Sequence, residues 1–157
     1  MTQEHTFLLQ RVQPAMVGLI DGSLSTLAPI FAVVLASHDT RYAFIAGLAT
    51  SLGAAISMGF SEGLSDTGEL TGRGASMPRG LITGVGTFFG GSFHALPFLI
   101  PQRATALAVA YAVVSVELVV IALVRRKFLE VPLTTSLIQV TLGGIIVAGV
   151  GVALGQA

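Results

Sequence analysis

Long apolar stretches alternate with short polar connectors along this chain. Five stretches carry almost no charge, and they cover residues 14–37, 43–64, 80–100, 104–124 and 134–156. A helix needs about 20 apolar residues to cross the hydrocarbon core of a bilayer, and runs of this length favour membrane helices over strands. The pattern therefore predicts an all-α, polytopic membrane protein with five transmembrane helices in a lipid bilayer.

Two alternatives to this interpretation depend on particular stretches. Pro97 and Pro101 lie near the end of the third stretch, where they favour a break in the helix. A soluble helical bundle needs polar faces toward water, and residues 104–124 and 134–156 almost lack them. Only 10% of all residues are charged, against roughly 25% in soluble domains. We therefore favour five membrane helices.

The connectors define the domain organisation and the orientation. Residues 1–13 form a polar tail, residues 14–157 form the transmembrane domain, and residues 65–79 link the second and third helices. Basic residues collect on the cytoplasmic side of membrane proteins. With the N-terminus inside, six basic residues are cytoplasmic and two are not: Arg11, Arg73, Arg79, Arg125, Arg126 and Lys127 against Arg41 and Arg103. This distribution predicts a cytoplasmic N-terminal tail and a cytoplasmic link.

Charge and residue content argue against several function classes. A net charge of zero gives no basic surface for a nucleic acid. Because the chain has no cysteine, it has no disulfide and no thiolate metal ligand. It also lacks a phosphate-binding loop, an HExxH helix and a nucleophile–base pair at an informative spacing. We therefore expect neither an enzyme nor a permanently bound cofactor.

Small residues recur at a spacing of four within the apolar stretches. The third stretch has this spacing twice, from Gly80 to Gly84 and from Gly86 to Gly90. In lipid, small residues allow helices to approach closely, because hydrophobic burial does not drive them together. The spacing predicts a tight bundle and a candidate subunit interface.

Four ionisable residues lie inside or at the end of apolar stretches: Asp21, Glu62, His94 and Glu117. A charged side chain in a membrane span costs several kcal/mol, so each needs a partner or a function. Asp21 is the strongest candidate for an intramembrane metal ligand or proton carrier. The alternative is a structural role, in which its carboxylate bonds to a nearby hydroxyl such as that of Ser23, Ser25 or Thr26.

Met58, Glu62, Asp66 and Glu69 are spaced four, four and three residues apart, which predicts one stripe on a helix. Three carboxylates on one face repel each other, and a bound cation would remove the repulsion. The thioether of Met58 suits first-row transition metals better than Mg²⁺ or Ca²⁺. In the alternative interpretation, Asp66 and Glu69 are solvated and Met58 only packs.

The functions of His94 and Glu117 stay open at this point. His94 is a candidate for a metal ligand, a proton relay or a buried neutral side chain with a bonded partner. Glu117 could pair with His94, bond in its protonated form or belong to a second site.

The segments at residues 18–26 and 53–62, which read GLIDGSLST and GAAISMGFSE, resemble the vacuolar iron transporter family. Residues 65–74 and 94–97 are similar in particular to the membrane domain of bacterial membrane-bound ferritins, which export iron. The resemblance implies five spans, a cytoplasmic N-terminus and a homodimer that exchanges Fe²⁺, in some members Mn²⁺, for protons. It also implies the inner membrane of a bacterium as the location.

Residue by residue, the resemblance places Asp21 and Met58 on the metal pathway and Glu62 one turn nearer the cytoplasm. Two features differ from the family. The link at residues 65–79 is too short for the Glu-rich insert of the plant-type transporters, and only residues 1–13 precede the first span, where membrane-bound ferritins carry a ferritin-like domain. We therefore expect iron loading or oxidation to depend on a separate ferritin-like protein, if it occurs.

The resulting hypothesis is a homodimer whose first two helices from each subunit meet at the two-fold axis. Symmetry doubles the ligands Asp21, Met58 and Glu62, and protons compete with Fe²⁺ for the same oxygens. Entry through Glu62, Asp66 and Glu69 gives export from the cytoplasm. The rival hypothesis is a membrane anchor or assembly partner for a ferritin-like protein that transports nothing.

Overall fold

Helices make up almost all of the chain in the computed structural model, which describes residues 3–69 and 71–157. The elements are α1 (Gln3–Phe7), a π-helix η1 (Leu8–Val12), α2 (Gln13–Ser37), α3 (Thr40–Ser65), α4 (Ser76–Ala95), a 3-10 helix η2 (Leu96–Leu99), α5 (Arg103–Leu129) and α6 (Leu133–Gln156). These two ranges contain no strand. The prediction of an all-α fold is confirmed.

Four helical segments are long and apolar enough to cross a membrane: Gln3–Ser37, Thr40–Ser65, Arg103–Leu129 and Leu133–Gln156. This is consistent with a membrane protein. The third predicted span is not among them, so a count of five stays a prediction. Helix α4 has less apolar character because it carries glycines, Thr83, Thr87 and His94, which are buried against other helices. It ends at Ala95, and the chain continues past Pro97 as η2, so the third stretch does break near its prolines.

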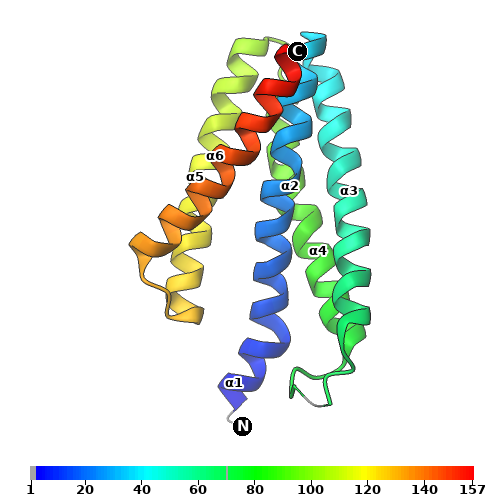
Figure 1. Cartoon of the computed structure of the whole chain (residues 1–157), viewed down its shortest axis with the longest axis vertical. Helices are drawn as coiled ribbons and strands as arrows, with labels where there is room; N and C mark the ends of the chain where they lie inside the picture. Colours follow the sequence, from blue (N-terminus) through cyan, green and yellow to red (C-terminus); the bar gives the residue numbers. More distant parts are fainter. Residues whose placement is uncertain (1–2, 70) are drawn as a thin grey trace.

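Helix α2 lies at the centre of the bundle (Figure 1), with α3 and α4 on one side and the hairpin of α5 and α6 on the other. The N-terminus, the α3–α4 loop and the α5–α6 turn lie at one end, and the C-terminus lies at the opposite end. The six basic residues predicted to be cytoplasmic belong to segments at the first of these ends.

Glycines bring α2 and α4 into direct backbone contact. A Cβ atom on Gly18 would lie 2.1 Å from the Thr83 carbonyl oxygen, and one on Gly22 would lie 2.0 Å from that of Thr87. From the other side, a Cβ on Gly90 would lie 2.5 Å from the carbonyl oxygen of Leu19. No side chain fits at these positions. The small residues therefore produce close helix contacts, as their spacing predicts.

The α5–α6 hairpin contacts α2 in two different ways. In its C-terminal half, α6 places Gly151 against the backbone of Ala28, where a Cβ would lie 2.5 Å from the carbonyl oxygen. Toward the N-terminal end, the contact is a cluster of apolar side chains centred on Met16, Ile121 and Val140. In the view of Figure 1, the hairpin diverges from α2 toward this end.

Candidate functional site

Three helices contribute to a buried polar cluster, which we call the His94–Glu117 cluster and which consists of Ser23, Thr26, His94 and Glu117. His94 Nε2 on α4 lies 2.8 Å from Glu117 Oε2 on α5, and their side chains are 3% and 10% exposed. On α2, Ser23 Oγ lies 2.5 Å from Glu117 Oε1. Thr26 Oγ1 lies 3.4 Å from His94 Nδ1. The four side chains form one continuous chain of polar contacts.

The geometry of α2 explains why Ser23 and Thr26 lie at the two ends of this series of polar contacts. Residues three apart lie on the same side of a helix, so both hydroxyls point toward α4 and α5. Each hydroxyl also bonds within its own helix: Ser23 Oγ lies 2.7 Å from the Leu19 carbonyl, and Thr26 Oγ1 lies 3.0 Å from that of Gly22. Glycines at positions 22 and 91 let α4 approach closely enough for the contact with His94.

Of the alternatives open from the sequence, the structure supports a pair between His94 and Glu117. Their facing atoms have no hydrogen-bond partner in the described part of the chain, although they lie 2.8 Å apart, because their alignment falls outside normal hydrogen-bond geometry. The sequence predicts Ser23 and Thr26 only as partners of Asp21. Their spacing of three was the available signal that both face the same neighbours.

Asp21 lies on a different side of α2 from this cluster. It precedes Ile30 by nine residues, or about 2.5 turns, so the two side chains point in opposite directions. Ile30 points toward α3, since a Cβ on Gly47 would lie 2.8 Å from its side chain. Asp21 therefore points away from α3. Its side chain is half-buried.

The carboxylate of Asp21 has no bonding partner within residues 3–69 and 71–157. The structural alternative required a bond from a neighbouring hydroxyl, but Ser25 Oγ donates to the backbone oxygen of Asp21 and not to its side chain. Ser23 and Thr26 point to the His94–Glu117 cluster. An unpaired carboxylate in the middle of a long apolar helix is costly, and nothing in one chain compensates it.

Glu62 and Asp66 form ion pairs with two arginines of the α3–α4 connection. Arg79, whose side chain is only 1% exposed, places Nε 2.8 Å from Glu62 Oε1 and Nη2 3.2 Å from Asp66 Oδ2. Arg73, which is 22% exposed, lies 2.7 Å from Glu62 Oε1 and 3.3 Å from Asp66 Oδ2. Two positive charges thus balance two negative charges at this end of the bundle.

The pKa of Asp66 reflects this arrangement. Desolvation at the helix end acts to raise it, but the charge of Arg79, hydrogen bonds from Gly68 and Arg79, and the charge of Arg73 together lower the pKa of this carboxyl below its ordinary value. Asp66 is therefore held in its ionised form by the arginines.

The prediction of one helical stripe from Met58 to Glu69 is wrong beyond Glu62. Helix α3 ends at Ser65, and Asp66 caps it with extended backbone. The chain then turns through glycines with positive φ, at 83° for Gly68 and 71° for Gly74, which leaves Glu69 exposed in the loop. The glycines and the ion pairs with Arg79 favour a compact turn over a longer helix.

The predicted metal ligands do not converge within one chain. The described residues contain no group of three or more His, Asp or Glu side chains that could hold a metal ion. Met58 lies on the same inward face of α3 as Gly47 and Glu62. Asp21 lies on the face of α2 on which Leu24 and Ala28 contact α6, so the two side chains are not directed at one point. A shared site for Asp21 and Met58 would need more than one subunit.

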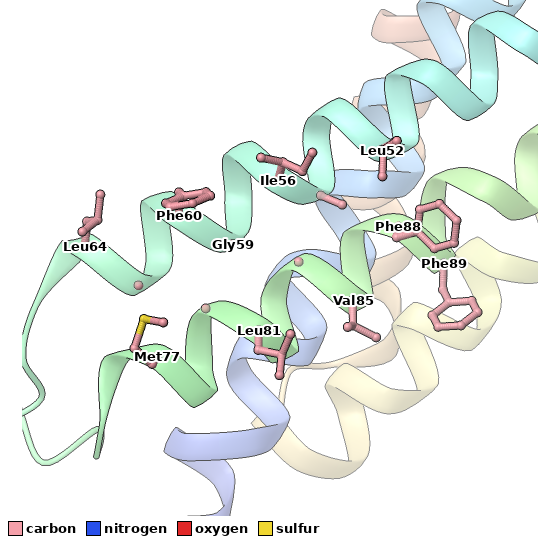
Figure 2. A pocket seen from close by; sticks show the side chains of 14 residues that line it. Leu52, Ile56, Gly59, Phe60, Leu64, Met77, Leu81, Val85, Phe88 and Phe89 are labelled. Carbon is pink, nitrogen blue, oxygen red and sulfur yellow. The ribbon is translucent and has the colours of Figure 1, made fainter.

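An apolar groove of about 450 Å³ lies between α3 and α4 (Figure 2). Its floor is formed by glycines and its rims by large apolar side chains, among them Leu52, Ile56, Phe60, Leu64, Met77, Leu81, Val85, Phe88 and Phe89. No charged residue lines the groove.

Comparisons with known protein families, with curated proteins and with solved structures found no significant match for this chain. The resemblance to the vacuolar iron transporters therefore stays a prediction from the motifs around Asp21 and Met58.

Proposed function

We propose that this protein moves a divalent transition metal ion, Fe²⁺ or Mn²⁺, out of the cytoplasm in exchange for protons. In this proposal, the protein is a homodimer in the inner membrane of a bacterium, and its N-terminus lies in the cytoplasm. Four helices long and apolar enough to span a bilayer support the location in a membrane. The metal and the proton are substrates in this proposal, and no resident cofactor is needed.

The observation that carries the proposal is the unpaired carboxylate of Asp21. It lies about two turns from the start of α2, is half-buried and points away from α3. A chain with a purely structural role in a membrane gains nothing from such a group, which costs several kcal/mol. A cation bound at Asp21 would offset this cost.

A second copy of the chain would supply the ligands that one copy lacks. If the Asp21 face of α2 lies at a two-fold axis, the two Asp21 carboxylates face each other. Two carboxylates close together do not both ionise easily, so a proton and a divalent cation compete for their oxygens. This competition is sufficient for exchange of metal against protons. Oxygen ligands accept Fe²⁺ and Mn²⁺ alike.

The ion pairs at the cytoplasmic end change the proposed entry route. Because Arg73 and Arg79 hold Glu62 and Asp66, a metal ion can bind these carboxylates only after an arginine moves. Because Arg73 is the more exposed of the two arginines, we propose that Arg73 is the one that moves to admit the metal ion. Glu69 is an exposed carboxylate in the loop at this end.

The test is anaerobic Fe²⁺ flux into proteoliposomes with and without a proton gradient. We expect wild-type flux that the gradient drives, and its loss in Asp21→Asn. Asp39→Asn is the matched control, because Asp39 caps α3 outside the bundle by accepting from the Arg41 amide, and asparagine caps equally well. Wild-type flux in Asp21→Asn would refute the proposed site.

Absence of flux from well-folded wild type would favour the second candidate, a membrane anchor for a ferritin-like protein. Co-purification with such a protein would then be expected, and the unpaired Asp21 would mark the contact between subunits.

A further inference from the structure

We propose that the groove between α3 and α4 holds one acyl chain of a membrane phospholipid, in the leaflet on the side of the α3–α4 loop. The occupant is a lipid chain and not a helix of a second copy. The inference requires a chain that lies in a bilayer, which the four membrane-length helices support, and it does not depend on metal transport.

Two rows of large apolar side chains form the rims of the groove, one row on each helix (Figure 2). Consecutive residues within a row are four apart, so each row follows one side of its helix. All eight side chains are 47–81% exposed, so no described element covers either row. The rows are Leu52, Ile56, Phe60 and Leu64 on α3, and Met77, Leu81, Val85 and Phe89 on α4.

Glycines close the floor of the groove. A Cβ atom on Gly80 would lie 2.5 Å from the Gly59 carbonyl oxygen, and one on Gly84 would lie 2.8 Å from that of Ala55. The backbones of α3 and α4 therefore touch along the floor. Because the two helices cannot approach any further, the hollow between the rims stays open, and a group from outside the chain must fill it.

The length of the groove matches the depth of one leaflet. From Leu52 to Leu64 the groove follows α3 for about 18 Å, since each residue adds about 1.5 Å. Half of a hydrocarbon core of about 30 Å is about 15 Å. The groove begins next to Ser65, where α3 ends and the loop follows, so it runs from the membrane surface toward the middle of the bilayer. A phospholipid with its headgroup beside the loop would place one chain along this path.

The cross-section of the groove fits a hydrocarbon chain and is too small for a helix. A volume of about 450 Å³ over a length of about 18 Å gives a cross-section of about 25 Å². A helix with its side chains is about 10–12 Å wide, so its cross-section is about 80–110 Å². Helices in lipid also approach each other through small residues, but the small residues here lie below rims of Leu, Ile, Phe and Met.

The lining of the groove suits hydrocarbon alone. All 14 lining residues are glycine, alanine or large apolar residues. Because bulk lipid is as apolar as this lining, the burial of apolar surface does not hold the chain in place. Dispersion contacts with the two rows do so, since each atom pair contributes little but their sum is large. A substitution that fills the groove should therefore release the lipid chain.

Quenching of a single tryptophan by brominated phosphatidylcholine tests the site, because the chain has no tryptophan of its own. Phe60→Trp and Leu81→Trp place reporters on the two rims, and Ile138→Trp on α6 is the reference. The three positions are 60–70% exposed and lie equally far from their helix ends on this side of the bundle. In detergent micelles with a rising lipid fraction, we expect quenching that saturates at a low lipid fraction at both rims. At Ile138 we expect quenching in proportion to the lipid fraction.

Gly63→Leu, made in the Phe60→Trp protein, tests whether the lipid chain lies in the groove itself. Gly63 lines the groove, and a Cβ atom there meets nothing within 4 Å, so a leucine side chain is directed into the hollow. We expect this substitution to abolish the saturable quenching. Gly149→Leu in the same protein is the matched control, because a Cβ on Gly149 also meets nothing within 4 Å but lies on α6.

Rim quenching that only follows the lipid fraction, as at Ile138, overturns the proposal, because it reports ordinary contact with bulk lipid. Saturable quenching that survives Gly63→Leu overturns it as well. Rims that stay unquenched at every lipid fraction would assign the groove to a second copy of the chain. Leu81→Trp carries the same test if Phe60→Trp does not fold. Since none of these outcomes depends on Fe²⁺ flux, this inference and the proposed function fail independently.

Discussion

Replacing Gly22 by alanine tests whether backbone contact between α2 and α4 holds the bundle together. The new Cβ would lie 2.0 Å from the Thr87 carbonyl oxygen and 2.8 Å from the Gly91 amide nitrogen. Because real Cβ contacts stay beyond 3.0 Å, α2 and α4 must move about 1 Å apart at this point. The atoms met are backbone atoms, so no side-chain rotation can relieve the clash.

Overpacking of this kind costs about 1–3 kcal/mol. For a chain of this size, that corresponds to a decrease in Tm of roughly 2–12 °C. The same displacement would also break the contact between Thr26 and His94, already 3.4 Å long, one turn farther along α2. We therefore expect Gly22→Ala to destabilise the fold and to weaken the His94–Glu117 cluster together.

Thermal unfolding in detergent, followed by circular dichroism, measures the effect. Gly53→Ala and Gly149→Ala are the controls, because a Cβ at either position meets nothing within 4 Å. These two substitutions should leave Tm unchanged or raise stability by up to about 1 kcal/mol, since alanine is the better helix former. A Tm for Gly22→Ala equal to that of Gly53→Ala would refute the close contact.

Three further predictions concern the ion pairs at the α3–α4 connection. Arg79→Met should reduce the free energy of unfolding by about 3–5 kcal/mol, because it leaves two carboxylates without their buried partner. Arg73→Gln should reduce the free energy of unfolding by up to about 1 kcal/mol, because Arg73 is more exposed than Arg79. Equal losses for the two variants in denaturant titration would contradict this assignment. The pKa of Asp66 is lowered in the folded state, so its contribution to the free energy of unfolding is present above the ordinary pKa and is lost as the pH falls through the lowered value. Acid should therefore reduce the Tm of wild type more than the Tm of Asp66→Asn.

The helical class and four membrane-length segments could be predicted from the sequence, because apolar run length is a strong signal. The apolar signal of the third predicted span is weaker, because α4 is buried through glycines and hydroxyl residues packed on α2 and α3 and not through an apolar surface. The prolines after it correctly indicated where the helix would stop.

The candidate site was predicted in part. The pairing of His94 with Glu117 was one of several alternatives, and only packing could select it. The stripe through Asp66 and Glu69 failed because spacing alone assumes that the helix continues, whereas glycines at 68 and 74 and a buried Arg79 end it at Ser65. Arginine partners for Glu62 lie 11 and 17 residues away, beyond what helical spacing can show.

The two kinds of contact made by α2 have a mechanical consequence. Backbone held against backbone, as at Gly22 and Gly151, forms a stiff joint, because no flexible side chain lies between the helices. The apolar side chains around Met16 and Val140 form a softer joint, which can slide by changes of rotamer. The lower half of the α5–α6 hairpin can therefore swing about a pivot near Gly151, and Glu117 lies across the seam that such a swing would open. The contact between His94 and Glu117 is then one of the links that fasten the hairpin to the rest of the bundle.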